Sequence, residues 1–324
     1  MLRVIFTEAD LAQVRVAPAA DPLWEIANSL DRLQTKRGRW AYAPWYRAAS
    51  ETLTDPVLRK QVTSLLLPLF PRAAYFPDFL TPPAALNGLE AGIDAILSTP
   101  TERVTSELKT LALVHQAPSW APRLAAGDLH SDLGAALRMY HHRVIEPHSD
   151  LISAELAADR ATRARALARG GPDRLLNSFQ PLMRWRPPVL EVRYPINRTI
   201  HLAGRGLQLT PSYFCWQNAI TLADTDLSPV LVYPVLRELP TSQTSDATAA
   251  ALLGKTRAAI LRATIPGRTA AEIATQIGIG APTTSHHLTV LRDSGLITTQ
   301  RAGKALLHVL TPLGAALLRQ QPVR

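Results

Sequence analysis

The chain has 324 residues, of which 47% are hydrophobic and 19% charged, a composition that excludes a disordered protein and predicts about two folded domains. It has no run of about 18 apolar residues and a single cysteine, Cys215, which excludes a membrane-spanning helix, an internal disulfide and a multi-cysteine zinc site. Residues 241–324 hold nine Lys or Arg against three Asp or Glu, so most of the net charge of +9 lies in the last quarter, as in a small DNA-binding module. We expect a soluble, cytoplasmic protein in which Cys215 is a buried apolar residue.

The first half of the chain predicts helices, preceded by two short strands. Residues 2–6 and 14–16 have the composition of strands, and a small helix begins between them at Glu8. Apolar spacing then predicts a series of helices, over 22–33, 46–53, 56–67, 86–97 and 101–115, and a long helical stretch over 129–168.

Beyond residue 190 the pattern changes to short β-branched or alternating runs separated by Pro, Gly and Asn. These runs predict strands over 190–194, 199–203, 207–210 and 230–233, with Gly204-Arg205-Gly206 as a hairpin turn. They would form a small sheet, which the N-terminal strands could complete. A polar stretch at 240–246 predicts a linker. We therefore expect an α+β, mainly helical protein, with a helical N-terminal domain and its small sheet over 1–240 and a C-terminal winged helix-turn-helix domain over 241–324.

The densest cluster of ligand-type side chains lies inside the long helical stretch and consists of His141, His142, Glu146 and His148. His142 and Glu146 are four residues apart and would share a helical face, as zinc ligands do. Pro147 should end the helix before His148, and the spacing is not that of metal hydrolases. We therefore favour a helix end capped by imidazoles, and expect no metal.

Two further groups in the N-terminal domain each allow two interpretations. The first is a set of arginines in and after the long helix, Arg160, Arg163, Arg165, Arg169 and Arg174. They could form an anion or effector site, but a solvated helix surface is favoured. The second is an aromatic group beside Arg37 and Arg39, consisting of Trp40, Tyr42, Trp45 and Tyr46. It could line an apolar ligand pocket, but a hydrophobic core is favoured.

Residues 269–296 predict two short helices joined by a tight turn. Thr269 and Glu272 have the spacing of a reciprocal capping box, which begins the first helix. Gly278 can end that helix in a left-handed conformation, and Gly280 lets the next helix start within three residues. This arrangement is typical of the DNA-reading unit of helix-turn-helix proteins.

The second helix of this unit has one apolar face and one polar face. Thr284, Leu288 and Leu291 follow the helical repeat and should face the core. The opposite face and its flanks carry small or uncharged side chains: Thr283, Ser285, His286, His287, Thr289 and Val290. Hydroxyl and imidazole groups of this kind can reach base edges in a major groove.

A hairpin with a basic tip follows. Residues 296–300 and 305–310 predict two strands, and the connection between them contains Arg301 and Lys304, which are placed to neutralise phosphates. A packing helix over 252–264 and a final helix over 313–319 complete a winged-helix domain.

The C-terminal region resembles the winged-helix domain of ArsR-like bacterial repressors. The resemblance lies in the order of three segments: LLGKTRAAILRAT, then AAEIATQIGIGAPTTSHHLTVLRDSGLI, then a basic hairpin. Its most specific part is the SHHLxVLxxxGL run at 285–296. The resemblance implies a homodimer that places two recognition helices in successive major grooves of a roughly palindromic operator. Metal sensors of that family carry paired cysteines before the turn, or acidic and histidine ligands in the last helix. Ala274-Thr275-Gln276 and residues 312–318 hold neither cysteine nor carboxylate, so the resemblance implies DNA binding without metal sensing.

The N-terminal domain carries a weaker resemblance. Residues 6–11, 187–192 and 200–207 look like the uncharacterised N-terminal domain of a group of ArsR-like regulators, for which no ligand can be transferred. By this interpretation the domain would bind a small-molecule effector or a partner, or would add dimer interface.

We expect a sequence-specific transcriptional regulator of double-stranded DNA, a repressor rather than an activator, without enzymatic activity or cofactor. The expected DNA-contacting residues are Ala281, Thr283, Ser285, His286, His287, Thr289, Arg292, Arg301 and Lys304. Ser285, Arg292, Arg301 and Lys304 among them would contact phosphates. Two alternatives remain: a metabolite-acting, metal-dependent enzyme domain fused to an autoregulatory winged helix, and a winged helix that serves only protein interaction.

Overall fold

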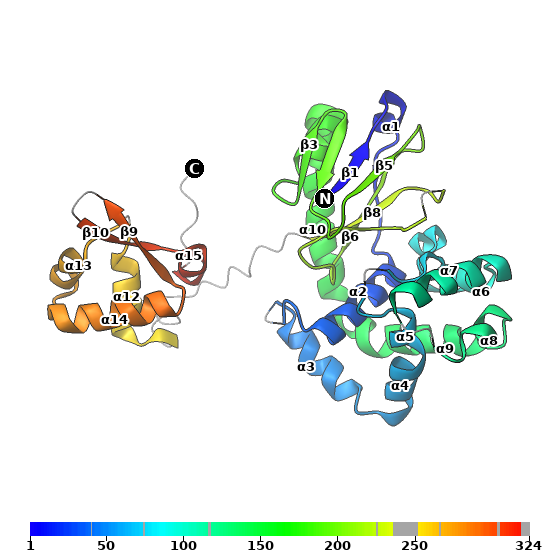
Figure 1. Cartoon of the computed structure of the whole chain (residues 1–324), viewed down its shortest axis with the longest axis horizontal. Coiled ribbons are helices and arrows are strands. Elements are labelled where there is room, and N and C mark those ends of the chain that lie inside the picture. The colour runs from blue at the N-terminus through cyan, green and yellow to red at the C-terminus, as the bar shows by residue number, and fades with distance from the viewer. Residues whose placement is uncertain are drawn as a thin grey trace. The chain divides into compact units, whose positions relative to one another are not determined.

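We describe the protein from a computed structural model, shown in Figure 1. It describes residues 1–39, 41–73, 75–115, 118–224, 226–235, 252–265, 267–302 and 305–318. The chain divides into two compact units, Met1–Arg237 and Glu238–Arg324, and each is treated by itself. The predicted linker at 240–246 lies outside the described residues. Within the described ranges, no helix combines the length and the apolar character that crossing a membrane requires.

The first unit is mainly helical, as predicted, and its helices precede most of its strands. They are α1 (Glu8–Ala12), α2 (Pro22–Thr35), α3 (Ala43–Thr52), α4 (Pro56–Gln61), the π-helix η1 (Val62–Leu66), α5 (Leu67–Leu69), the 3₁₀ helices η2 (Asp78–Leu80) and η3 (Pro83–Asn87), α6 (Leu89–Leu97), α7 (Thr101–Val114), α8 (Ala121–Ala125), α9 (His130–Tyr140), the π-helix η4 (His141–Ile145), the 3₁₀ helix η5 (Glu146–His148) and α10 (Ser149–Asn177). Figure 1 shows the helices α2 to α9 gathered on one side of the unit and the strands on the other.

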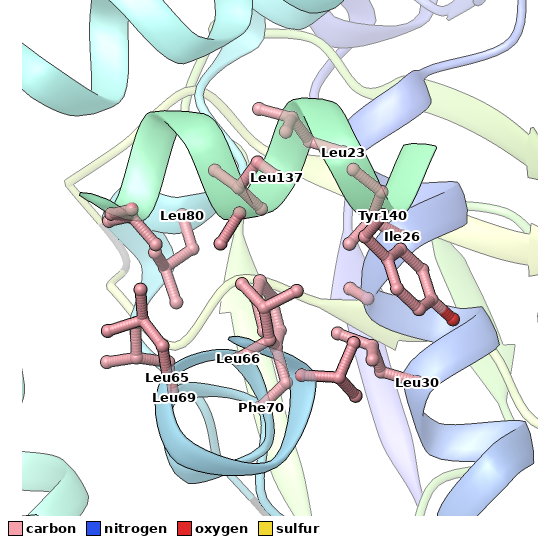
Figure 2. Close-up of a cluster of buried hydrophobic side chains, with 14 of the residues drawn as sticks. Leu23, Ile26, Leu30, Leu65, Leu66, Leu69, Phe70, Leu80, Leu137 and Tyr140 are labelled. Carbon is pink, nitrogen blue, oxygen red and sulfur yellow. The ribbon is translucent and has the colours of Figure 1, made fainter. Parts of the chain in front are cut away.

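The main core lies between α2, α9 and the continuous η1–α5 segment. Figure 2 shows Leu137 of α9 facing Leu66 of η1, with Ile26 and Leu30 of α2 beside them. All four side chains are fully buried. Burial of each aliphatic side chain of this size stabilises the fold by about 2 kcal/mol, so these contacts fix the positions of the three segments. The hydroxyl of Tyr140, also buried, lies 3.0 Å from Ser29 Oγ and thereby keeps a polar partner.

The helix predicted over 56–67 changes to a π-helix at Val62–Leu66, just before Pro68. Pro68 has no N–H to donate to the carbonyl of Ser64, four residues earlier, so a regular helix would leave that oxygen unpaired. The indole Nε1 of Trp120 donates to it instead, at 3.0 Å. A tertiary contact therefore completes the hydrogen bonding that the proline interrupts.

The helical stretch predicted over 129–168 is interrupted at a second proline. The π-helix His141–Ile145 precedes Pro147, and the indole Nε1 of Trp45 donates to the Val144 carbonyl at 3.0 Å. Beyond the break, α10 extends to Asn177, past the predicted end, although Gly170 and Gly171 have non-helical backbone angles. The break at Pro147 was expected from the sequence, whereas the π-helix before it, the extension to Asn177 and the non-helical angles at Gly170 and Gly171 were not predicted.

The strands form two four-stranded sheets in place of the single small sheet that was predicted. One has the order β3-β4-β1-β5, and the other β2-β6-β8-β7. The strands are β1 (Leu2–Ile5), β2 (Arg15–Val16), β3 (Met183–Arg186), β4 (Val189–Val192), β5 (Arg198–His201), β6 (Gln208–Ser212), β7 (Ile220–Thr221) and β8 (Val230–Pro234). The N-terminal strands do complete the sheets, since β1 is antiparallel to β4 and parallel to β5 while β2 pairs with β6. Strands β3 and β7 were not predicted.

The prediction of a hairpin turn at Gly204-Arg205-Gly206 was wrong. The strands on either side, β5 and β6, belong to different sheets, so this segment crosses from one sheet to the other. Gly206 N donates to Asp10 Oδ1 at 2.9 Å, and Gly206 has φ +70°. A side chain there would start 2.6 Å from Gln13 Cβ, so the close approach to α1 requires glycine.

One of the arginines expected on a solvated surface is part of the core. Arg163 Nη2 donates to Asp159 Oδ1 at 2.8 Å, and both side chains are no more than 5% exposed. Asp159 Oδ2 accepts from the hydroxyl of Tyr233 on β8 at 2.6 Å, and the guanidinium carbon of Arg163 lies 4.2 Å from the centre of the Phe179 ring. Arg165, Arg169 and Arg174 are exposed, as expected, and Arg160 is half-buried.

The aromatic group belongs to the core, which was the favoured interpretation. Tyr42, Trp45 and Tyr46 are buried, and the Tyr42 hydroxyl donates to the Tyr213 carbonyl at 3.0 Å. Trp40 lies outside the described residues. Cys215 is buried as predicted, and burial raises the pKa of its thiol to about 12, which leaves it without thiolate character.

Helix α2 also buries a carboxylate that the sequence analysis did not single out. Glu25 is 2% exposed and accepts hydrogen bonds from Tyr213 N at 2.7 Å, Phe214 N at 3.1 Å and Ser212 Oγ at 3.1 Å. Burial raises its pKa to about 7. Asp21, which caps α2 through Leu23 N at 3.0 Å, likewise has its pKa raised to about 6 by burial. Glu25 therefore joins α2 to the end of β6 and the segment after it, whereas Asp21 binds backbone N–H groups of α2 itself.

Candidate nucleic-acid interface

The second unit begins its helix pair at the predicted capping box. Thr269 N donates to Glu272 Oε2 at 2.8 Å, and Glu272 N donates to Thr269 Oγ1 at 3.3 Å, at the start of α13 (Ala270–Ile277). The Glu272 carboxylate accepts from Thr269 N and from the Thr269 hydroxyl, and these two hydrogen bonds lower the pKa of Glu272. Gly278 ends the helix with φ +73°, a left-handed conformation that favours glycine. The turn is therefore set by local chemistry, as predicted.

Helix α14 (Ala281–Asp293) follows after Gly280 and buries the predicted face. Thr284 is completely buried, Leu288 is 3% exposed and Leu291 is 1% exposed. The Thr284 hydroxyl donates to the Gly280 carbonyl at 3.1 Å, so the one polar group on this face has a partner. The packing fixes the rotation of α14 about its axis.

The buried side chains of this core come from four elements of the unit, and Leu310 of β10 (Ala305–Leu310) and Leu317 and Leu318 of α15 (Pro312–Leu318) pack against them while partly buried. The core joins side chains from α12 (Lys255–Ala263), α13, α14 and the start of β9 (Ile297–Ala302), namely Ile260, Leu261, Ala263, Ile273, Leu288, Leu291, Leu296 and Ile297. Helix α15 packs against the hairpin through Gly314, where a Cβ would lie 2.0 Å from the Leu296 carbonyl oxygen. The predicted packing helix and final helix are both present, apart from residue 319, which lies outside the described residues.

The face of α14 opposite the core is exposed and uncharged. Ala281, Thr283, Ser285, His286 and Thr289 are exposed, whereas His287 and Val290 are half-buried. None of the five exposed side chains carries a carboxylate, which would repel phosphates. The structure thus brings the predicted base-reading residues together on one surface, and their contact with DNA stays a prediction.

His286 and His287 are adjacent but differ in their surroundings. Their ring centres are 5.6 Å apart, and Nδ1 of His287 is buried without a hydrogen-bond partner. Burial lowers the pKa of His287, and the positive charges of Arg257 on α12 and of His286 add to this effect. Arg257 was not predicted to belong to this surface. Its charge interaction with His287 spans 30 positions in sequence, which no local pattern would reveal.

The hairpin follows α14 and presents part of the predicted basic tip. Strands β9 and β10 are antiparallel, with Ala302 opposite Ala305. Arg301 is exposed at the end of β9, next to the tip, whereas Lys304 lies outside the described residues. Arg292, half-exposed near the end of α14, lies 3.6 Å from Asp293 Oδ1, so its charge is partly offset.

The histidine cluster of the first unit does not assemble into a metal site. His142 Nδ1 lies 2.6 Å from Glu146 Oε2, as the spacing predicted, but both side chains are more than half exposed. Burial lowers the pKa of His141 and of His148. Within the part of the chain that the structure describes, no three His, Cys, Asp or Glu side chains converge as metal ligands.

Comparison with known proteins supports the assignment of the second unit. Residues 252–300 match a family described as a helix-turn-helix domain. The chain is also similar to proteins named biofilm growth-associated repressor from Xylella fastidiosa strains Temecula1 and 9a5c, with 49% identity over 47 residues in both cases. The match covers 14% of this chain and 41% of each relative, so the chain spans about two fifths of the length of these relatives. No solved structure matches the chain. The C-terminal region is therefore a helix-turn-helix domain.

Proposed function

We propose that this protein is a sequence-specific DNA-binding transcriptional regulator, and a repressor, in which α14 is the recognition helix and the β9–β10 hairpin is the wing of an ArsR-like domain. The observation that best supports this proposal is the division of α14 into a buried face and an exposed face. Thr284, Leu288 and Leu291 hold it in the core, while His286 and Thr289 face outward with hydrogen-bonding groups. Such a helix can enter a major groove without a conformational change.

The charges of the second unit support the same function. Arg301 at the end of β9 has the position of a wing residue that contacts a phosphate beside the groove. The last quarter of the chain holds three times as many basic as acidic residues. Repression is proposed because the similar proteins are named repressors.

A homodimer that binds a roughly palindromic operator is the proposed assembly. Helices α12 and α15 contact each other, and Leu252 and Leu313, just before α12 and within α15, are 69% and 58% exposed. Exposed leucines at this position would be covered in a dimer. In this proposal the first unit has no enzymatic role and changes the DNA affinity of the dimer when it binds an effector.

Two variants separate base reading from phosphate binding. Selection of bound fragments from genomic DNA would define the operator, and fluorescence anisotropy would measure affinity for it and for random DNA at several salt concentrations. His286→Ala is expected to reduce the ratio of specific to non-specific affinity by about tenfold. Arg301→Ala should weaken both affinities and lower the salt slope by about two for a dimer, about one for each phosphate contact.

Arg169→Ala, which removes an exposed cation of the first unit, is the matched control and should change neither quantity. Equal affinity of the wild type for operator and random DNA at physiological salt would refute the sequence-specific regulator. A salt slope unchanged by Arg301→Ala would refute the phosphate contact alone.

A further inference from the structure

The first unit has an open groove of about 670 Å³ with an apolar floor. It is lined by residues of α4, η1 and α8 and by Leu129 at the start of α9. Leu65 and Leu129 are largely buried, and Trp120 is half-buried. The hydrogen bond from Trp120 Nε1 to the Ser64 carbonyl fixes the indole in place. The groove therefore has a preformed aromatic and aliphatic surface of the size that small ligands occupy.

Polar groups of the groove favour an anion that also carries a hydrogen-bond donor. Lys60 of α4 and Arg123 of α8 line it and are exposed, and Asp132 is the acid beside them. None of these three side chains forms an ion pair with another residue in the described ranges. Gln61 also lines the groove, and its Oε1 is buried without a hydrogen-bond partner. Buried polar atoms usually have a partner, and rotation of the Gln61 side chain toward the groove would let a bound donor supply it.

We propose that this groove binds a small organic acid with an apolar ring. The carboxylate would be held between Lys60 and Arg123, the ring would lie on Trp120, and an N–H or O–H of the ligand would donate to Gln61 Oε1. Lys60 and Arg123 together carry one more unit of positive charge than Asp132 offsets, so the groove matches a ligand with a single negative charge. This site goes beyond the proposed DNA-binding function, because it assigns a ligand class to the first unit.

Calorimetric titration of the full chain, without DNA, tests the site with three matched probes. Indole-3-acetate carries the carboxylate and the N–H, indole-3-acetamide lacks the charge, and 1-naphthaleneacetate lacks the N–H. Indole-3-acetate is expected to bind about tenfold more tightly than the acetamide. The Lys60→Gln/Arg123→Gln variant should abolish that difference, and both positions are exposed, so the fold is retained.

Arg59→Gln/Lys109→Gln, which removes two exposed cations that do not line the groove, is the control and should bind like the wild type. Gln61→Leu should weaken indole-3-acetate and leave 1-naphthaleneacetate unchanged. The proposal is overturned if the acetamide binds as tightly as the acid, if the double variant at Lys60 and Arg123 binds all probes like the wild type, or if no probe binds at millimolar concentration. None of these outcomes depends on DNA binding, so each is distinct from a failure of the proposed function.

Discussion

Glu25 provides a quantitative test of the buried contacts between α2 and the segment after β6. Its carboxylate is 2% exposed, and burial raises its pKa from 4.5 to about 7 although three donors bind it. In the unfolded chain the group ionises near its ordinary value, so between these two pH values the folded state holds one more proton. The free energy of unfolding therefore falls as pH rises through this window. Glu25→Gln removes the titration and keeps the size of the side chain.

The magnitude follows from the shift in pKa. A shift of one unit corresponds to about 1.4 kcal/mol, so the full effect is about 3 kcal/mol, of which about 2.5 kcal/mol falls between pH 5 and pH 8. The expected result is that Glu25→Gln becomes more stable relative to the wild type by this amount as pH rises. Taking the difference between the two proteins largely cancels Asp21 and other groups that titrate in the same range.

Urea unfolding followed by tryptophan fluorescence at pH 5, 6, 7 and 8 measures the difference. All six tryptophans precede residue 217 and lie in the first unit, so the fluorescence reports on this unit alone. A stability difference that stays constant across this pH range would refute the reasoning. It would mean that the donors from Ser212, Tyr213 and Phe214 fully compensate the burial of the charge.

Three further predictions concern other contacts. Gly314→Ala should destabilise the second unit by about 2 kcal/mol or more, because its Cβ would lie 2.0 Å from the Leu296 carbonyl oxygen. Amide hydrogen exchange over 252–318 measures the loss of stability. The control Gly280→Ala, whose Cβ meets only Pro282 Cδ at 3.8 Å, should have little effect on exchange. Equal exchange in the two variants would contradict the close packing of Gly314 against Leu296. Arg163→Met should cost about 3–5 kcal/mol in tryptophan-monitored unfolding, because it leaves Asp159 buried without its ion pair. Adding Asp159→Asn should recover part of the lost free energy of unfolding, and the absence of any recovery would contradict a buried charge pair. Arg257→Gln should raise the pKa of His287 toward its ordinary value of 6.5, as measured by imidazole NMR titration, and an unchanged titration would exclude the charge interaction.

The sequence predicted the helix-turn-helix best because the signals there are local. The capping box of Thr269 and Glu272 involves residues three apart, and the left-handed Gly278 follows the last turn directly. The inward face of α14 follows from the helical repeat alone. These features were confirmed at the atomic level. The strands flanking the hairpin tip were also found where predicted, because short alternating runs around a tight connection leave few other pairings.

Predictions failed where the deciding partner is distant in the chain. The hairpin turn at 204–206 was wrong because Asp10 and Gln13, nearly 200 residues earlier, bind that segment between two sheets. Arg163 was assigned to a solvated surface because the residues near it in sequence do not indicate that Tyr233 and Phe179 pack around its ion pair with Asp159. The π-helix before Pro68 was missed, since its stabilising donor is the indole of Trp120.

The helical character of the protein and its C-terminal helix-turn-helix could be predicted from local sequence, because helical periodicity, caps and glycine turns act over three to seven residues. The division of the strands into two sheets, the burial of Glu25 and Arg163, and the groove beside Trp120 became visible only in the folded chain. Each of these depends on the proximity of side chains from remote segments, and proximity changes the solvation and the hydrogen-bond partners of a group in ways that its local sequence does not specify.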